Sequence, residues 1–210
     1  RLLGNDPIFM KAIANTLFYA SLSVILGMLA SVFLSYYLDK PVRGRSVFRI
    51  LIFLPSVIPL VAAAQLFQRV LSPGGMLNSM LATIGIQGPQ WLLDPAAILP
   101  ALIIMSLWNV GGSTVLVLAG MQSIPSSLVE AALMDGASKP AIFRRITLPL
   151  LSPVLFFNTI MGIIGGLQTF GQVYIMTKGL MGPDNASMMM VPYLYLNAFR
   201  DYQMGYASAI

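Results

Sequence analysis

The stretch AIANTLFYASLSVILGMLASVFLSYYL, residues 12–38, runs from Lys11 to Asp39 without a charged side chain. An α-helix needs about 20 consecutive, mostly apolar residues to cross the hydrocarbon core of a bilayer. The stretch is longer than that, so it predicts a membrane-spanning helix. The bilayer is therefore the solvent in which the rest of the sequence is interpreted.

The composition of the whole chain agrees with a membrane protein. Of the 210 residues, 57% are hydrophobic and 9% are charged, whereas about a quarter of a typical soluble domain is charged. Charge-poor stretches predict spans at approximately 12–38, 47–69, 96–120 and 150–176, with the start of another at residue 206. Because the chain begins at Arg1 and stops as an apolar run begins, we expect a fragment of a longer subunit.

The residue types that are missing limit the chemistry. The chain has no Cys and no His, which excludes disulfides, thiol chemistry and the commonest metal and acid–base ligands. A membrane enzyme should carry nucleophilic or charged clusters near the membrane surface, and none is visible among the seven carboxylates. We therefore expect no catalytic residue, no metal site and no enzymatic activity.

The basic residues indicate how the chain is oriented. They form two clusters in the predicted loops, Lys40, Arg43, Arg45 and Arg49 in the first and Lys139, Arg144 and Arg145 in the second. Two predicted spans separate the clusters, so both face the same side, and the positive-inside rule places loops 39–49 and 121–149 in the cytoplasm. The net charge of +5 is thus explained by topology, and no nucleic-acid partner is expected.

The second cluster belongs to a charged island, EAALMDGASKPAIFRRITLPLL, residues 130–151. Ser127 and Glu130 match a capping box, which predicts that a helix starts there. Gly136 is well placed to end that helix with a positive φ. A second short helix can start at Ser138 with Pro140 in its first turn. The pattern predicts a helix–glycine–helix segment at the cytoplasmic surface, and an ordinary amphipathic connector is the alternative.

The spacing of the island resembles a known family. Glu130-Ala131-Ala132 is followed after three residues by Gly136, and after nine more by Ile146, one residue and Leu148-Pro149. This pattern is similar to that of the inner-membrane permeases of binding-protein-dependent ABC importers. Asn15-Thr16-Leu17, WNVGG (108–112) and VYIMT (173–177) resemble the sugar-permease branch of that family. KGLMGP (178–183) departs from it, because the branch usually has Gly-Gly-Pro soon after the Thr.

The resemblance implies an all-α, polytopic transmembrane helical bundle like that of type I ABC importer permeases. Residues 1–210 would form a single transmembrane domain from a six-span subunit, in the cytoplasmic (inner) membrane of a bacterium or archaeon. Segment 125–149 would hold the coupling helix that contacts the ATPase. The residues that the resemblance assigns to this coupling are Glu130, Ala131, Ala132, Asp135, Gly136, Ile146, Leu148 and Pro149.

The resemblance also implies partners. Two ABC ATPase subunits would bind and hydrolyse ATP, so this chain would bind no cofactor itself. A second permease subunit, expected to be a different chain, an extracytoplasmic solute-binding protein and membrane lipid complete the set. The implied function is ATP-driven import of a carbohydrate such as an oligosaccharide, a disaccharide or glycerol phosphate. A permease for a non-sugar solute, or a secondary transporter or channel, is the alternative, although the spans lack the ionisable residues typical of ion-coupled carriers.

Neutral polar residues within the spans are candidates for the substrate path. Amides and hydroxyls suit sugar hydroxyl groups, which need both donors and acceptors. We select Asn109, Gln168 and Thr169 as the best candidates. The alternative is that any of these side chains forms hydrogen bonds between helices.

Overall fold

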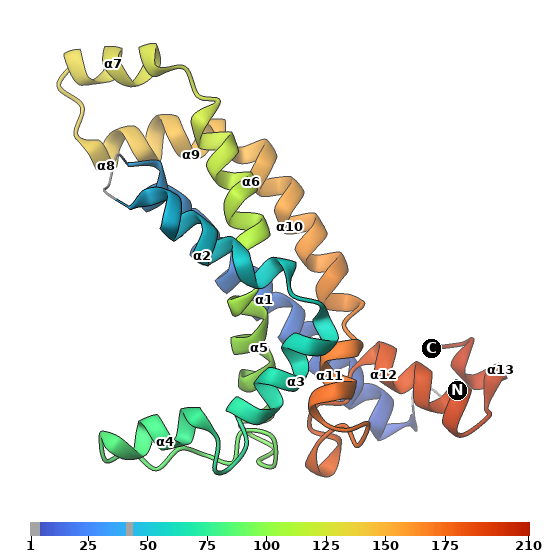
Figure 1. Cartoon of the computed structure of the whole chain (residues 1–210). Coiled ribbons are helices and arrows are strands. Elements are labelled where there is room, and N and C mark those ends of the chain that lie inside the picture. Colours follow the sequence, from blue (N-terminus) through green and yellow to red (C-terminus); the bar gives the residue numbers. More distant parts are fainter. Residues whose placement is uncertain (1–4, 41–43) are drawn as a thin grey trace. The chain divides into compact units, whose positions relative to one another are not determined.

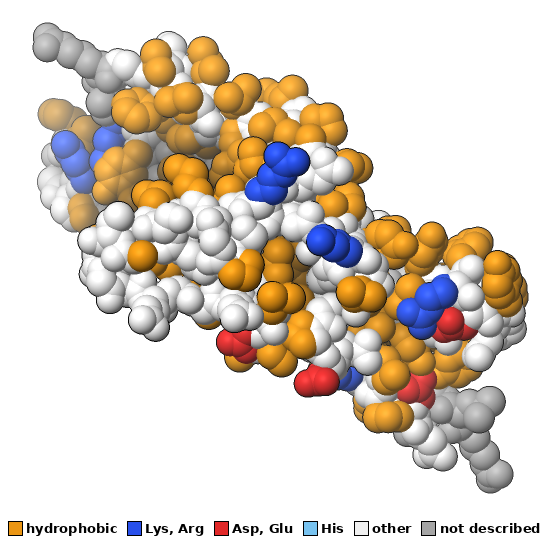
Figure 2. All heavy atoms as spheres, turned by 60° about the horizontal axis from the view of Figure 1, so that its bottom comes forward, with side chains coloured by type: hydrophobic (Ala, Val, Ile, Leu, Met, Phe, Trp, Pro, Cys, Tyr) orange, Lys and Arg blue, Asp and Glu red, His pale blue; other side chains and the backbone are white. Residues whose placement is uncertain are grey.

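The computed structural model describes residues 5–40 and 44–210, so Arg43 of the first basic cluster lies outside the described residues. All regular structure in the described residues is helical, which confirms the predicted all-α class. On the face drawn in Figure 2, hydrophobic side chains are widespread and charged ones are few. That surface is typical of a protein surrounded by lipid.

The helices follow one another along the chain as labelled in Figure 1. Their bounds are α1 (Pro7–Asp39), α2 (Arg45–Val57), α3 (Leu60–Val70), α4 (Met76–Thr83), α5 (Ile98–Trp108), α6 (Gly111–Gln122), α7 (Ser126–Met134), α8 (Lys139–Ile142), η2 (Phe143–Thr147), α9 (Leu148–Leu150), α10 (Ser152–Leu167), α11 (Gly171–Met176), η3 (Pro183–Asn185), α12 (Met190–Tyr195), η4 (Leu196–Arg200) and α13 (Met204–Ala207). η2 and η4 are π-helical turns, and η3 is a 3₁₀ turn.

Helix α1 is the one described helix that is long and apolar enough to cross a membrane by itself. Three bent helix pairs pass the same test when each is taken as one span, which gives up to four spans. They are α2 with α3, α5 with α6, and Lys139–Leu150 with α10. The predicted spans 47–69, 96–120 and 150–176 thus each fall on two or more helices rather than one. Pro59 accounts for the first interruption, because proline disfavours a helical conformation in the residue before it.

The chain divides into two compact units. Unit 1 consists of Arg1–Val24, Ile58–Ser106 and Ile163–Ile210, and unit 2 consists of Ile25–Val57 and Leu107–Gly162. The island 130–151 therefore lies wholly in unit 2. Each unit is described by itself below.

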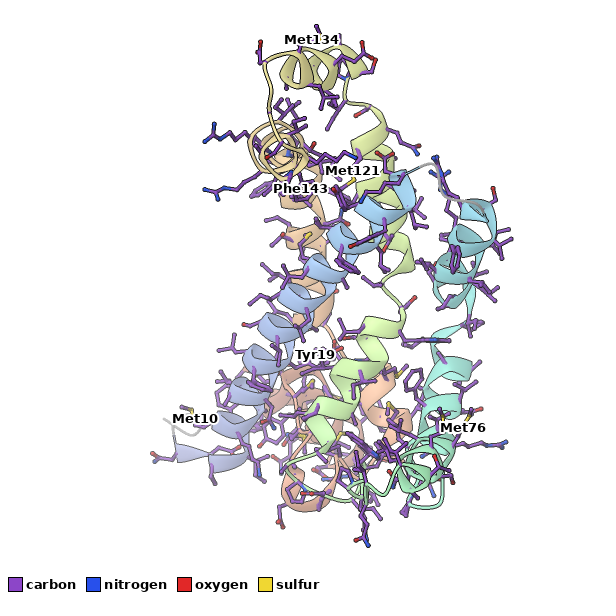
Figure 3. The ribbon with its side chains drawn as sticks, turned by 90° about the vertical axis from the view of Figure 1, so that its left-hand side faces the viewer. Met10, Tyr19, Met76, Met121, Met134 and Phe143 are labelled. Atoms are coloured by element: carbon purple, nitrogen blue, oxygen red, sulfur yellow. The ribbon has the colours of Figure 1, made fainter. Side chains whose placement is uncertain are left out.

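Unit 2 is held together by close packing around α6. A Cβ atom on Gly111, the first residue of α6, would lie 2.2 Å from the carbonyl oxygen of Ile52, so only glycine permits this approach of α2. Further along α6, Val117 and Met121 pack with Leu151 in a buried cluster, against which Phe143 also packs. Figure 3 shows Met121 and Phe143 close to each other. The start of the α8–α10 segment is thereby anchored to α6.

In unit 1, polar side chains of α1 form hydrogen bonds with backbone groups of a distant segment. The Asn15 amide of α1 donates to the carbonyls of Ala186 and Met188 at 3.0 and 2.9 Å. The Thr16 hydroxyl accepts from the backbone N–H of Met190 at 2.9 Å. Met188 is buried. Asn15 and Thr16 therefore hold the segment before α12 against α1.

Asp6, just before α1, connects three helices of unit 1. Its Oδ1 accepts hydrogen bonds from the backbone N–H groups of Ile8 and Phe9 at 2.9 and 3.2 Å, which caps α1. Its Oδ2 accepts from the hydroxyls of Tyr193 in α12 and Tyr206 in α13. Partial burial raises the pKa of Asp6, but these hydrogen bonds outweigh it and hold the pKa below its usual value.

Asp6→Asn is expected to destabilise the protein by about 1 kcal/mol, the usual contribution of such hydrogen bonds. Because the folded pKa is lowered, the stabilisation is complete above the unfolded pKa and is lost as the pH falls through the folded one. In thermal unfolding in detergent, the wild type should therefore lose stability as the pH falls below about 4, and Asp6→Asn should not show this loss. Asp184→Asn, at an exposed carboxylate of the same unit, is the control, and an equal effect of both substitutions contradicts the assignment.

Candidate functional site

Helix α7 begins two residues earlier than the capping box predicts, because its N-cap is Pro125 and not Ser127. Pro125 is its N-cap residue, no side chain caps it, and the carbonyl of Pro125 accepts from the N–H of Leu128 at 3.2 Å. Ser127 therefore lies inside the helix and Glu130 a full turn from its start. The predicted capping box is wrong because Pro125, with its fixed φ, already sets the chain direction that enters the helix.

The C-terminal end of α7 forms as predicted, on a glycine. Gly136 has a φ of +78°. Its N–H donates to the carbonyl of Leu133 at 3.0 Å, and the N–H of Ala137 donates to the carbonyl of Ala132 at 2.9 Å. These two bonds form a Schellman motif, which satisfies the last carbonyls of a helix and reverses the chain after it.

Helix α7 has no buried residue. Its apolar side chains Leu128, Leu133 and Met134 are 44%, 50% and 89% exposed, and Met134 lies at the end of the helix in Figure 3. A surface helix of a folded protein normally buries its apolar stripe. Here no described part of the chain covers it, so the helix presents an apolar surface together with the carboxylate of Glu130.

The predicted coupling residues separate into an exposed group and a packed group. Glu130, Ala131, Asp135 and Gly136 are exposed on α7 and its turn, and Ala132 is half-buried. The residues of the second half of the motif lie in the helical segment that follows, where Ile146 and Leu148 are half-buried and Pro149 is exposed.

The second helix of the island runs from Lys139 through η2 to Leu150 and then bends by 64° into α10. Since Phe143 and Leu151 pack against α6, the segment that carries the second half of the motif is anchored to α6.

Sequence reasoning missed a polar clasp beside α7. With its amide turned so that the oxygen faces α2, Gln122, the last residue of α6, accepts hydrogen bonds from Arg45 Nη2 at 3.1 Å and Arg49 Nη2 at 2.6 Å. Both arginines belong to α2 and had been interpreted only as markers of topology. The sequence signal that could have predicted this contact is the amide side chain at the end of α6. The clasp connects α2 to the residue that precedes the Ser123–Pro125 link into α7.

The three candidate substrate residues lie where helices are interrupted. Asn109 is exposed in the turn between α5 and α6, in unit 2. Gln168 and Thr169, in unit 1, lie between α10 and α11; Gln168 is exposed, and the Thr169 hydroxyl donates to the carbonyl of Gly165 at 3.0 Å. At membrane depth, non-helical backbone is tolerated where it is buried in protein or lines a water-filled cavity.

Several other polar residues of the spans act within the fold. The amide of Gln68 donates to the carbonyls of Ile175 and Met176, both at 3.2 Å, at the end of α11. Asn158 donates to the carbonyl of Val154 in its own helix at 3.1 Å, and Gln172 donates to the hydroxyl of Tyr19. These side chains therefore form hydrogen bonds within and between helices.

The fold and the site thus define a class of protein. It is an all-helical membrane protein with an exposed helix that carries Glu-Ala-Ala and ends on a glycine. The family of binding-protein-dependent transport system inner membrane components matches residues 23–210. The chain belongs to this family, whose members are transporter permeases and not enzymes. The membership predicted from the motif spacing is confirmed.

Individual relatives agree with the family. The chain is 37% identical to a probable ABC transporter permease protein, YesP, of Bacillus subtilis, over 100% of this chain and 68% of the relative. It is 38% identical to the lactose transport system permease protein LacF of Rhizobium radiobacter, over 94% of this chain and 68% of the relative. The chain thus spans about two thirds of the length of these relatives.

A solved structure also resembles the chain. A bacterial ABC transporter involved in the import of the acidic polysaccharide alginate superposes with a TM-score of 0.85 at 26% identity. The match covers 99% of this chain and 74% of that one.

Proposed function

We propose that this chain forms part of the membrane path of an ATP-driven importer of carbohydrates and that α7 is its docking helix for an ABC ATPase subunit. The observation that carries the docking assignment is the exposure of α7, whose apolar side chains and Glu130 contact no core. Core positions of protein interfaces are apolar, with few charges. A short helix held at both ends, with its surface free, suits docking into a cleft of a partner.

Movement of α7 would be transmitted to the membrane-spanning helices of unit 2. At its N-terminal end, α7 follows α6 directly, and the clasp of Gln122 with Arg45 and Arg49 connects α6 to α2. At its C-terminal end, the segment 139–150 packs on α6 and leads into α10. ATP-driven closure of the ATPase subunits would therefore displace α2, α6 and α10 together. The free energy comes from the partner, which explains why this chain needs no catalytic group.

The carbohydrate class is supported by the relatives. They include a lactose transport system permease and, in Thermococcus litoralis, a 33% identical permease of a trehalose/maltose transport system. The solved alginate transporter is also described in complex with a periplasmic protein that holds an alginate pentasaccharide. We extend both features to this chain as a carbohydrate substrate and an extracytoplasmic solute-binding protein. Asn109, Gln168 and Thr169 supply the neutral donors and acceptors that sugar hydroxyls require.

The proposed assembly has further subunits and a defined orientation in the membrane. Two ATPase subunits and a second permease subunit complete the transporter in the cytoplasmic membrane. Loops 39–49 and 121–149 face the cytoplasm, where α7 meets the ATPase. The loops that contain α4 and α12 would then face the solute-binding protein.

The substrate class is tested with the complete transporter in proteoliposomes. ATP hydrolysis is measured with the solute-binding protein loaded with lactose, trehalose, an arabino-oligosaccharide or an alginate oligosaccharide, and in parallel with amino acids. At least one carbohydrate should stimulate hydrolysis several-fold over the unloaded binding protein. Stimulation by amino acids alone would contradict the carbohydrate assignment while leaving the family membership intact.

A further inference from the structure

An apolar groove in unit 2 combines α1 with the segment that follows α7. It has a volume of about 900 Å³, within the range of about 300–1,000 Å³ found for ligand sites. Its lining is apolar apart from one tyrosine. The lining residues on α1 are Met28, Leu29, Ala30, Val32, Phe33 and Tyr36. Those on the segment from α8 to α10 are Pro140, Phe143, Leu148 and Leu155.

The groove matches the depth of one lipid leaflet. Its lining on α1 runs from Met28 to Tyr36, and α1 ends at Asp39. At 1.5 Å per residue, Met28 lies about 16 Å from that end of the helix. Half of the hydrocarbon core of a bilayer is about 15 Å thick. The groove therefore extends from the predicted cytoplasmic surface to about the middle of the membrane, as one acyl chain does.

Positive charge lies at the surface end of the groove. The Nζ atom of Lys40 lies 4.1 Å from the centre of the Tyr36 ring, and that ring packs edge-on against Phe143 at 5.0 Å. Arg144 is exposed and directly follows Phe143, which lines the groove. Neither Lys40 nor Arg144 forms an ion pair with an acidic residue within the described ranges.

We propose that this groove binds an anionic phospholipid, with an acyl chain along α1 and the phosphate between Lys40 and Arg144. Charge complementarity favours this occupant, because basic pockets between helices on the cytoplasmic side select anionic head groups. A transmembrane helix of a partner would gain nothing from the two unpaired cations. Since Leu148 and Pro140 line the groove, the lipid would support the segment that anchors α7.

The test measures lipid binding to the delipidated chain in detergent by native mass spectrometry, with phosphatidylglycerol and phosphatidylcholine as probes. Phosphatidylglycerol should bind about tenfold more tightly, and Lys40→Gln combined with Arg144→Gln should remove that preference. Arg69→Gln combined with Lys178→Gln, at exposed cations of unit 1, is the matched control and should change nothing. Ala30→Trp, which fills the groove, should weaken the binding of phosphatidylglycerol in a protein whose cations are intact.

Two results would overturn the proposal. In the first, both lipids bind equally and Lys40→Gln combined with Arg144→Gln changes nothing. This would mean that only non-selective boundary lipid is present. Loss of assembly with the second permease in Ala30→Trp, with lipid binding unchanged, would mean that a protein helix occupies the groove. Neither result bears on the coupling role of α7, which is measured separately.

Discussion

Gly111→Ala is expected to destabilise the protein by about 2–3 kcal/mol, the upper part of the range for overpacked sites. The new Cβ would lie 2.2 Å from the carbonyl oxygen of Ile52 and 3.0 Å from the Cα of Phe53. Both are backbone atoms of α2, so no side-chain rotation relieves the contact. Helix α2 would have to move away from α6, which also strains the clasp at Gln122.

The next residue offers a matched control. A Cβ on Gly112 would meet no atom within 4 Å. Gly112→Ala is expected to be neutral or to stabilise by up to about 1 kcal/mol, because alanine has less conformational freedom to lose. Thermal unfolding of both variants in the same detergent measures the difference. Equal stability of the two variants would contradict the close approach of α2 to α6.

Glu130→Lys is expected to abolish ATP-driven uptake while leaving the fold intact. Glu130 is exposed on a helix with no buried residue, so its replacement should change the stability by less than about 0.5 kcal/mol. If the side chain is buried against an ATPase subunit, reversing its charge costs about 2–5 kcal/mol of binding. Uptake in whole cells should then fall at least about 30-fold, since each 1.4 kcal/mol is a factor of ten.

Asp39→Lys controls for the change of charge alone. Asp39 is exposed in the same unit, at the end of α1, and lies outside α7. Its reversal should leave uptake close to that of the wild type, at equal amounts of protein in the membrane. Normal uptake by Glu130→Lys, or an equal loss in both variants, would count against α7 as the docking helix.

The sequence predicts best those features that depend on neighbouring residues. The run 12–38 predicts α1 because hydropathy and length alone decide whether a helix can span. Gly136 predicts the end of α7 because a positive φ favours glycine at that point. The motif spacing likewise predicts the family, since all its positions lie within one short segment.

The interruptions of the other spans could not be placed from hydropathy. Apolar residues continue on both sides of Pro59, and proline is tolerated in membrane helices. Whether such a helix stays continuous depends on which neighbouring groups satisfy the freed backbone. That is tertiary information, and the π-helical turn at Phe143–Thr147 is a further case.

The polar contacts were missed for a related reason. Tyr193 is buried and donates a hydrogen bond to Asp6, which lies 187 residues away in the sequence. Arg45 and Arg49 reach Gln122 because Gly111 lets α2 approach α6. A pattern based on charge explains why arginines face one side of a membrane, but it says nothing about their partners.

The most direct test of the coupling role of α7 uses the absence of native cysteine. Ala132→Cys is expressed with its ATPase subunit, which carries one engineered cysteine in the cleft that faces the permease, and disulfide formation is measured with and without ATP. We predict a crosslink whose yield changes with nucleotide. No crosslink to the ATPase, in protein that is folded and inserted, would contradict the account and leave α7 as an ordinary connector.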